Sequence, residues 1–467
     1  MSNRAIAQVG ALFAALFAIL IARQFYLQVI AGPAIAARPY NPRHALLGEL
    51  RGRIVAADGT ILAQTFRGKR IYPYGAALAQ TVGYVSQRYG TSGLEDAYDR
   101  ALTPPDTTGD PITQWGELLD ALGGKSSQVR GADIVTTINP AIESVLADQL
   151  APYARAAGVV LDPRTGAVLA IASLPSFDPN TLDRDFGSLL RNTSSPLLNR
   201  AIDGLYPPGS TFKIVTAGDA LDSGVVTMQS TFNDPGYLVV GNFTLHNDED
   251  EYTGTQDLTT AFALSSNVDF AQIALRLGVD RWYEYANRWG LGTSLDFQLP
   301  TQLDRIPEKS TVTPGELAQM GFGQGSLLVT PLRMALITAA IADKGSEPRP
   351  FIVRQVDQPH AQSSYSGATL ATPITADTAA QVKKMMIAVI ERGTGTVAAL
   401  PGVTVAGKTG TATNPLGRAH SWFVCFAPAE HPRAAVAIVV ENAGYGAAVA
   451  APIARNVLRT ALKNIQN

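Results

Sequence analysis

The segment from Gly402 to Gly417 can continue as a strand through its lysine but cannot begin a helix there. Its letters GVTVAGKT satisfy the glycine-rich pattern of phosphate-binding loops, which requires a helix to open at Lys408 and Thr409. Strand-forming residues (Val403–Ala406) precede this pair, and the following run GTATNPLG is rich in helix-breaking Gly, Asn and Pro. We therefore expect a strand that runs into Lys408 and no nucleotide site.

A serine and a lysine stand three residues apart in YPPGSTFKIVTAG, which is typical of a helix N-terminus. This spacing places Ser210 and Lys213 on one face. A serine hydroxyl needs an adjacent base to act as a nucleophile, and a lysine serves when burial and neighbouring cations lower its pKa. Backbone N–H groups at the helix start would stabilise an oxyanion. Taken alone, the pattern is better explained by a capping serine followed by a solvated lysine.

Two further motifs supply the other groups that acyl transfer needs. In ALSSNVDF, Ser265 is placed to relay a proton between lysine and leaving group. Asn267 is expected to donate to Lys213 and to accept from a substrate amide. Each of these residues is also an ordinary helix cap, so the motif carries weight only together with the others.

The third motif is the Lys-Thr-Gly sequence on the predicted strand. Lys408 is expected to attract a substrate carboxylate, with Thr409 beside it. Gly410 would let a substrate backbone approach, and Thr411 would bind alongside. The three motifs in this order, with an apolar strand beneath the last, favour a catalytic site over a structural explanation.

The chain is predicted to divide near residue 131. The text RGRIVAADGTILAQT alternates like a hairpin around Asp58 and Gly59. A helix is expected after the capping Asn139, and GVVLDPRTGAVLAIAS forms an antiparallel hairpin. The end of the chain adds the strand RAAVAIVV and an amphipathic helix. These elements predict an α+β fold in which helices cover an antiparallel sheet. The predicted parts are 1–30, 31–130 and 131–467.

An apolar run of 18 residues, Ala5–Ala22, has Gln8 as its one polar side chain and is just long enough to span a bilayer. A cleaved secretory signal is the alternative, with an A-x-A site within Ala34–Ala37. That site lies about a dozen residues beyond the run, which is too far for a usual signal peptide. We expect a short cytoplasmic tail, a single-pass anchor in residues 1–30 and an extracytoplasmic catalytic domain.

Composition excludes several classes of site. The net charge is −2, so nothing indicates a nucleic-acid surface. The five histidines lack metal-ligand spacing, and neither a metal nor another cofactor is expected. Cys425 is the single cysteine, so no intramolecular disulfide can form.

The three motifs and longer stretches resemble the penicillin-interacting serine transpeptidases, and among them the class B penicillin-binding proteins. The stretches include NRAIDGLYPPGSTFK, MGFGQGSLLVTPLRMALITAAIADKG and ERGTGTVAALPGVTVAGKTGTA. The resemblance implies the β-lactamase/transpeptidase-like fold, with a five-stranded antiparallel sheet, helices on both faces and a helical subdomain. A small β-rich pedestal and one transmembrane helix would precede it.

The resemblance also implies roles for the residues. Ser210 would be the nucleophile and Lys213 the base. Ser265 and Asn267 would form the second wall of the active site. The segment Lys408–Thr411 would be the substrate strand, and the backbone N–H groups of Ser210 and Thr411 the oxyanion hole. Ser210 would attack a peptidoglycan stem peptide between its terminal D-alanines, and the acyl-enzyme would cross-link to an amine of a neighbouring stem. A β-lactam would trap the enzyme. A SEDS-family membrane polymerase is the implied partner.

Two departures and three alternatives accompany this resemblance. The pedestal, of about a hundred residues, is shorter than in many members of the family. Ala56 and Ala57 stand where an Asp-Arg pair is common in the family, which affects inferred partner contacts but not catalysis. A class A β-lactamase would carry an E-x-E-L-N-like loop, and this sequence has none. A class D enzyme or a β-lactam sensor usually has S-x-V in place of the S-S-N found here. A non-catalytic scaffold would usually have lost one of the serine and lysine residues.

Overall fold

A computed structural model describes residues 50–104, 130–248, 253–358, 361–414 and 417–465, with scattered positions between 8 and 26. Half of the predicted anchor, Ala5–Ala22, lies outside the described residues. Among the residues that are described, none belongs to a helix long and apolar enough to cross a membrane.

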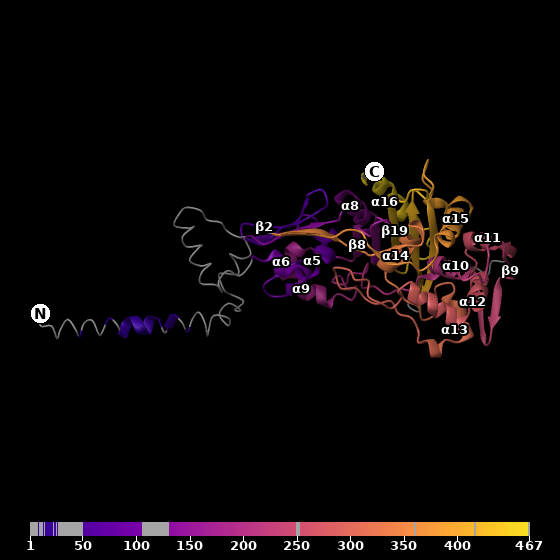
Figure 1. The fold of residues 1–467 in the computed structure, drawn as a ribbon, viewed down its shortest axis with the longest axis horizontal. Coiled ribbons are helices and arrows are strands. Elements are labelled where there is room, and N and C mark those ends of the chain that lie inside the picture. Colours follow the sequence, from indigo (N-terminus) through magenta and orange to yellow (C-terminus); the bar gives the residue numbers. More distant parts are fainter. Residues whose placement is uncertain are drawn as a thin grey trace.

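A five-stranded sheet forms the centre of the larger lobe, and all of its neighbouring strands are antiparallel, as predicted (Figure 1). Its strands in spatial order are β17 (Ala406–Asn414), β18 (Gly417–Ala427), β19 (Ala434–Val440), β7 (Ala156–Leu161) and β8 (Val168–Leu174). The predicted hairpin is the β7–β8 pair. The strand β17 lies at one edge, so one side of its backbone has no neighbour in this sheet.

Helices cover both faces of this sheet. Every residue of β7 and of β19 is buried, and because successive side chains point to opposite faces, both faces must be covered. The covering helices are α8 (Pro140–Leu150), α16 (Ala450–Asn464), α14 (Pro331–Ala342) and α15 (Ala376–Arg392). The side chain of Asn139 caps α8 by accepting from the N–H groups of Ala141 and Ile142, as expected from the Asn-Pro pair.

A second sheet joins segments that are far apart in the sequence. Its order is β15 (Ala361–Ser364), β14 (Val353–Gln358), β6 (Asp133–Thr136), β1 (Ile54–Val55), β2 (Ile61–Phe66) and β3 (Lys69–Ile71). The β1–β2 pair is the hairpin predicted around Asp58, and β1 pairs with β6 in parallel. The sequence did not predict that β14 and β15 would extend the strands of the pedestal.

Shorter elements complete the two ends of the molecule. Beside the second sheet lie α4 (Ala79–Val82), β4 (Val85–Ser86), β5 (Gly90–Thr91), α5 (Gly93–Ala97), α6 (Asp99–Leu102) and α9 (Leu182–Arg191). At the far end lie α10 (Lys213–Asp222), α11 (Leu258–Leu264), α12 (Asn267–Arg288), α13 (Pro314–Met320) and the strands β9 (Thr231–Asp234), β10 (Tyr237–Val240), β11 (Phe243–His246) and β12 (Gly254–Asp257). Near α14 and α15, β13 (Glu347–Pro348) pairs with β16 (Thr369–Ala371). The helices at the far end form the predicted helical part.

Candidate active site

The serine of the first motif lies on a 3-10 turn, Gly209–Phe212, that leads directly into α10. The sequence predicted a helix start here, and the structure places the lysine rather than the serine at its first α-helical residue. Ser210 is 8% exposed and Lys213 is fully buried. A solvated lysine, the alternative explanation of this motif, is therefore excluded.

Glycines bring this turn against the strand β17. A Cβ added to Gly410 would lie 2.9 Å from Thr211 Cγ2 and 2.9 Å from Trp422 Cβ. A Cβ on Gly209, whose φ is +54°, would lie 2.7 Å from the carbonyl oxygen of Thr411. The sequence suggested that Gly410 makes room for substrate; in the structure it makes room for the turn that carries Ser210.

The Lys-Thr-Gly motif lies on β17, the edge strand. The strand begins at Ala406, whereas the strand-forming residues Val403–Ala406 predicted an earlier start. It continues through Lys408 to Asn414. No helix opens at Lys408, so this segment is not a phosphate-binding loop. The hydroxyl of Thr409 pairs with that of Thr394 at 2.6 Å.

The second motif occupies the junction between α11 and α12. Ser265 ends α11 in the left-handed conformation, with a φ of +67°, which is uncommon for a residue other than glycine. Ser266 caps α12 by accepting from the N–H of Asp269, and Asn267 is the first residue of that helix. The tight junction turns both Ser265 and Asn267 toward the lysines.

Lys213 contacts the second motif through three hydrogen bonds. Its Nζ donates to the carbonyl oxygen of Ser265 at 2.5 Å, to Ser265 Oγ at 3.2 Å and to Asn267 Oδ1 at 2.8 Å. The amide of Asn267 therefore accepts from Lys213, and the expectation that it would donate to Lys213 is wrong. An ammonium group offers only donors, so it selects the amide oxygen.

Lys408 reaches the same serine from the opposite side. Its Nζ lies 2.8 Å from Ser265 Oγ and 3.1 Å from the carbonyl oxygen of Thr409. Ser265 Oγ thus bridges the two lysines, which come from segments almost two hundred residues apart. The structure brings all three motifs together, with Ser210 on the turn that packs against β17.

Burial sets the charge state of both lysines. Loss of solvent lowers the pKa of Lys213 to about 7, although the carboxylates of Asp248, Asp269 and Asp234 favour its charged form. Burial, and then repulsion from Lys213, holds the pKa of Lys408 well below its ordinary value. Lys213 can therefore exist as a neutral amine near neutral pH, which a general base requires.

A buried carboxylate that sequence reasoning missed holds the second motif in place. Asp234 Oδ2 accepts from Asn247 Nδ2 at 2.7 Å, Thr253 Oγ1 at 2.7 Å and Ser266 Oγ at 2.6 Å. Asn247 Oδ1 in turn accepts from the backbone N–H of Asn267 at 2.8 Å. Burial opposes ionisation of Asp234, but these hydrogen bonds outweigh it and lower its pKa. The letters DPG after Asn233 predict only a turn.

Comparison with known families identifies this site. Residues 156–459 match the family described as the penicillin binding protein transpeptidase domain, and this range contains all three motifs. The chain belongs to the penicillin-binding proteins. Residues 51–134 of this penicillin-binding protein match a second family, the penicillin binding protein A dimerisation domain.

Similar proteins and structures extend over nearly the whole chain. The peptidoglycan D,D-transpeptidase PbpA of Mycolicibacterium smegmatis is 34% identical, over 99% of both chains. The structure of a D,D-transpeptidase domain from Eggerthella lenta is 35% identical, with a TM-score of 0.80 over 88% of this chain and 98% of that one. The penicillin G acyl-enzyme of penicillin-binding protein A from M. tuberculosis is 32% identical, with a TM-score of 0.80 over 89% and 100%. These neighbours are class B penicillin-binding proteins, as the sequence motifs suggested.

In the described part of this penicillin-binding protein, no group of three or more His, Cys, Asp or Glu side chains could hold a metal ion. The groups assembled at the site are instead a serine turn, two buried lysines, a bridging serine and an edge strand. Such a set suits covalent acyl transfer through Ser210.

Proposed function

We propose that this penicillin-binding protein is a peptidoglycan D,D-transpeptidase that cross-links stem peptides through an acyl-enzyme on Ser210. The observation that carries the proposal is the Ser265 hydroxyl shared by two buried lysines, beside the turn that holds the nucleophile. The names of its relatives support the same activity.

Acylation begins with the neutral amine of Lys213. It takes the proton of Ser210 Oγ as this oxygen bonds to the carbonyl carbon between the two terminal D-alanines. The backbone N–H groups of Ser210 and Thr411 are the proposed oxyanion hole, and the contact of Gly209 with Thr411 supports it by bringing these two backbones together. Collapse of the tetrahedral intermediate breaks the peptide bond.

The leaving amine needs a proton, and Ser265 supplies the route. The Ser265 hydroxyl protonates the departing D-alanine nitrogen and is replenished from Lys213 Nζ, which holds the proton taken from Ser210. Lys408 keeps the other side of Ser265 Oγ oriented and offers a positive charge to the substrate carboxylate when it is protonated. The edge of β17 that has no neighbour in its sheet would hold the stem peptide as an added strand.

The second half-reaction repeats these steps in reverse. An amine of a neighbouring stem attacks the acyl carbon, loses a proton through the same serine and lysine, and releases Ser210. A β-lactam reacts at its ring amide, and its leaving nitrogen stays tethered to the acyl group. The acyl-enzyme then persists, as in the penicillin G complex of the M. tuberculosis relative.

A test of the activity separates it from its alternatives. Purified protein and a stem pentapeptide should release D-alanine and form a cross-linked dimer when an acceptor amine is present. When penicillin is supplied in place of the peptide, a β-lactamase would release hydrolysed penicillin in many turnovers. A non-catalytic scaffold would react with neither the peptide nor penicillin.

We further propose a single-pass anchor at Ala5–Ala22, with the catalytic domain outside the cytoplasmic membrane of a bacterium and a SEDS-family polymerase as partner. The apolar run supports the anchor. Small residues along it would permit close packing against another membrane helix. Residues 51–134 match a family described as a dimerisation domain and not as a polymerase, which supports a separate protein as the source of glycan. Given lipid-linked disaccharide-pentapeptide, the protein alone should make no glycan chains; unaided polymerisation would refute the partner.

A further inference from the structure

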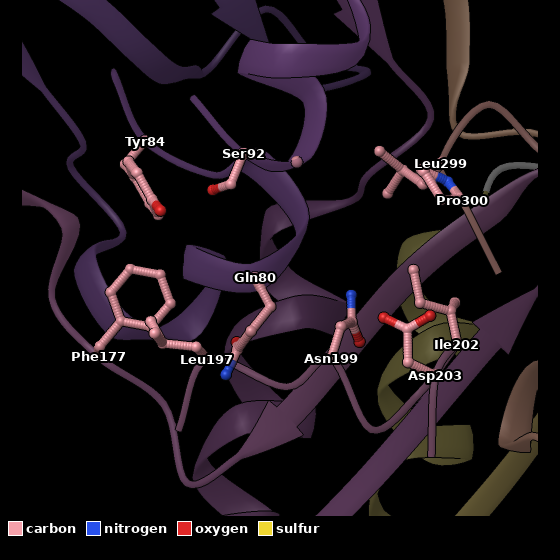
Figure 2. A pocket seen from close by; sticks show the side chains of 11 residues that line it. Gln80, Tyr84, Ser92, Phe177, Leu197, Asn199, Ile202, Asp203, Leu299 and Pro300 are labelled. Carbon is pink, nitrogen blue, oxygen red and sulfur yellow. The ribbon is translucent and has the colours of Figure 1, made fainter. Parts of the chain in front are cut away.

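A pocket of about 240 Å³ lies where the two matched regions meet, and none of its lining residues belongs to the three motifs (Figure 2). Gln80, Tyr84, Ser92 and Gly93 line it from the N-terminal region. Its remaining walls, Phe177, Leu197, Asn199, Ile202, Asp203, Leu299 and Pro300, come from the transpeptidase region. The volume is below the roughly 300 Å³ at which drug-sized sites begin, so it suits a group with one ring.

A buried amide in this pocket has an unused donor. Asn199 is 6% exposed, and its Nδ2 has no hydrogen-bond partner among the described residues. Its Oδ1 accepts from the backbone N–H of Ala201 at 3.2 Å, which fixes the orientation of the amide. Figure 2 shows the nitrogen directed into the space beside Asp203. The nitrogen atom itself is buried, so a ligand acceptor reaches it by displacing the side chain that covers it. An unpaired buried donor costs about 1–3 kcal/mol, which such an acceptor would offset.

The neighbouring carboxyl restricts the charge of a ligand. Asp203 lies one turn after Asn199, to whose carbonyl oxygen its N–H donates at 2.8 Å. It forms no ion pair with any described residue, and partial burial raises its pKa to about 6. An anionic ligand would be repelled by this carboxylate. An ammonium group offers only donors, so it could not accept a hydrogen bond from Asn199 Nδ2. A neutral group with an acceptor next to a donor satisfies both.

The other walls are apolar and include two aromatic rings. Tyr84 and Phe177 meet edge to face, with centroids 6.0 Å apart, and both are more than nine-tenths buried. They line the side of the pocket across from Asn199 and Asp203 in Figure 2, and Ile202 and Leu299 add aliphatic surface. A ring with apolar C–H groups would pack here.

We propose that this pocket binds an acetamido sugar. The acetamide oxygen would accept from Asn199 Nδ2, its N–H or a hydroxyl would donate to Asp203, and the sugar ring would pack on Tyr84 and Phe177. Acetamido sugars form the glycan of peptidoglycan, so the choice of ligand rests on the proposed function. A bound sugar would hold the pedestal and the transpeptidase region together.

The test measures binding of N-acetylglucosamine to the full chain by a saturation-transfer NMR titration. Wild type should bind it saturably and should not bind glucose, which lacks the amide. Leu197→Trp fills the pocket and should abolish binding, whereas Leu198→Trp, at the adjacent exposed position, should not change it. Asn199→Asp keeps the acceptor for Ala201 and should weaken binding about tenfold. Its control, Asn192→Asp, preserves a similar turn bond to Ser194 at an exposed site.

Several results would overturn the sugar site: equal binding of glucose, binding that survives both Leu197→Trp and Asn199→Asp, or tighter binding of N-acetylalanine methylamide, which would indicate a peptide ligand. Penicillin labelling verifies that each variant is folded. Ser210→Ala should bind the sugar like wild type, so the pocket and the proposed catalytic function can fail separately.

Discussion

Lys408 Nζ lies 2.8 Å from Ser265 Oγ, and the same hydroxyl receives Lys213 Nζ at 3.2 Å. Two buried amines around one hydroxyl cannot both remain charged at low cost, because each lacks solvent and repels the other. Repulsion from Lys213 contributes to the lowered pKa of Lys408. The pair therefore disfavours the state in which both lysines are charged, and this leaves a neutral amine that can take part in a relay through Ser265.

The first prediction concerns pH. With the pKa of Lys213 near 7, the neutral amine increases tenfold per pH unit below that value and levels off above it, and acylation by fluorescent penicillin should follow. Asp248→Asn removes an exposed carboxylate that favours the charged lysine, so the rise should move to lower pH. Asp377→Asn, far from the site, should leave the profile unchanged. A rise that moves to higher pH in Asp248→Asn would contradict the assignment of Lys213 as base.

The second prediction concerns Lys408. Lys408→Ala should slow acylation about 10²-fold, because it removes a substrate charge partner and a support of Ser265. Lys384→Ala, on the exposed side of α15, serves as control. Neither protein should bind ATP saturably in calorimetry. Micromolar affinity for ATP that is lost in Lys408→Ala would instead support a phosphate-binding loop at this segment and would contradict its assignment to the acyl-transfer site.

The third prediction tests the contact between the serine turn and β17. Gly410→Ala should push the turn away through Thr211 and should reduce the acylation rate at least about tenfold, with about 1–3 kcal/mol of lost stability. Thr211→Ser removes the Cγ2 that the new methyl meets but keeps the hydroxyl that donates to Pro208. The double variant should recover part of the rate. No recovery would mean that Gly410 acts through something other than this contact.

The fourth prediction concerns Asp234 as a positioning residue. Asp234→Ala removes the carboxylate that accepts from the side chains of Asn247, Thr253 and Ser266, and should cost about 3 kcal/mol in urea unfolding. It should also slow acylation under conditions where the variant is folded, because Asn247 no longer holds Asn267. The acylation pH profile should move to lower pH, since Asp234 favours charged Lys213. Lost stability with an unchanged rate and profile would show a role in folding alone.

The sequence predicted the elements with strong local signals. The hairpin around Asp58 and the cap at Asn139 each depend on residues that are neighbours in the sequence. The same is true of the residue pattern within each of the three motifs. The Asp234 contacts join segments 13 to 32 residues apart through common residue types, so no spacing marks them. The pairing of β1 with β6 and of β14 with the pedestal is likewise non-local. The orientation of Asn267 depended on the ammonium group beside it, which a motif does not specify.

Covalent labelling by fluorescent penicillin, followed by mass spectrometry of the labelled peptide, shows directly whether Ser210 is the nucleophile. We predict one adduct on Ser210 in wild type, none in Ser210→Ala, and labelling slowed about 10²- to 10⁴-fold in Lys213→Ala. An adduct on another residue, or undiminished labelling of Ser210→Ala, would contradict the account.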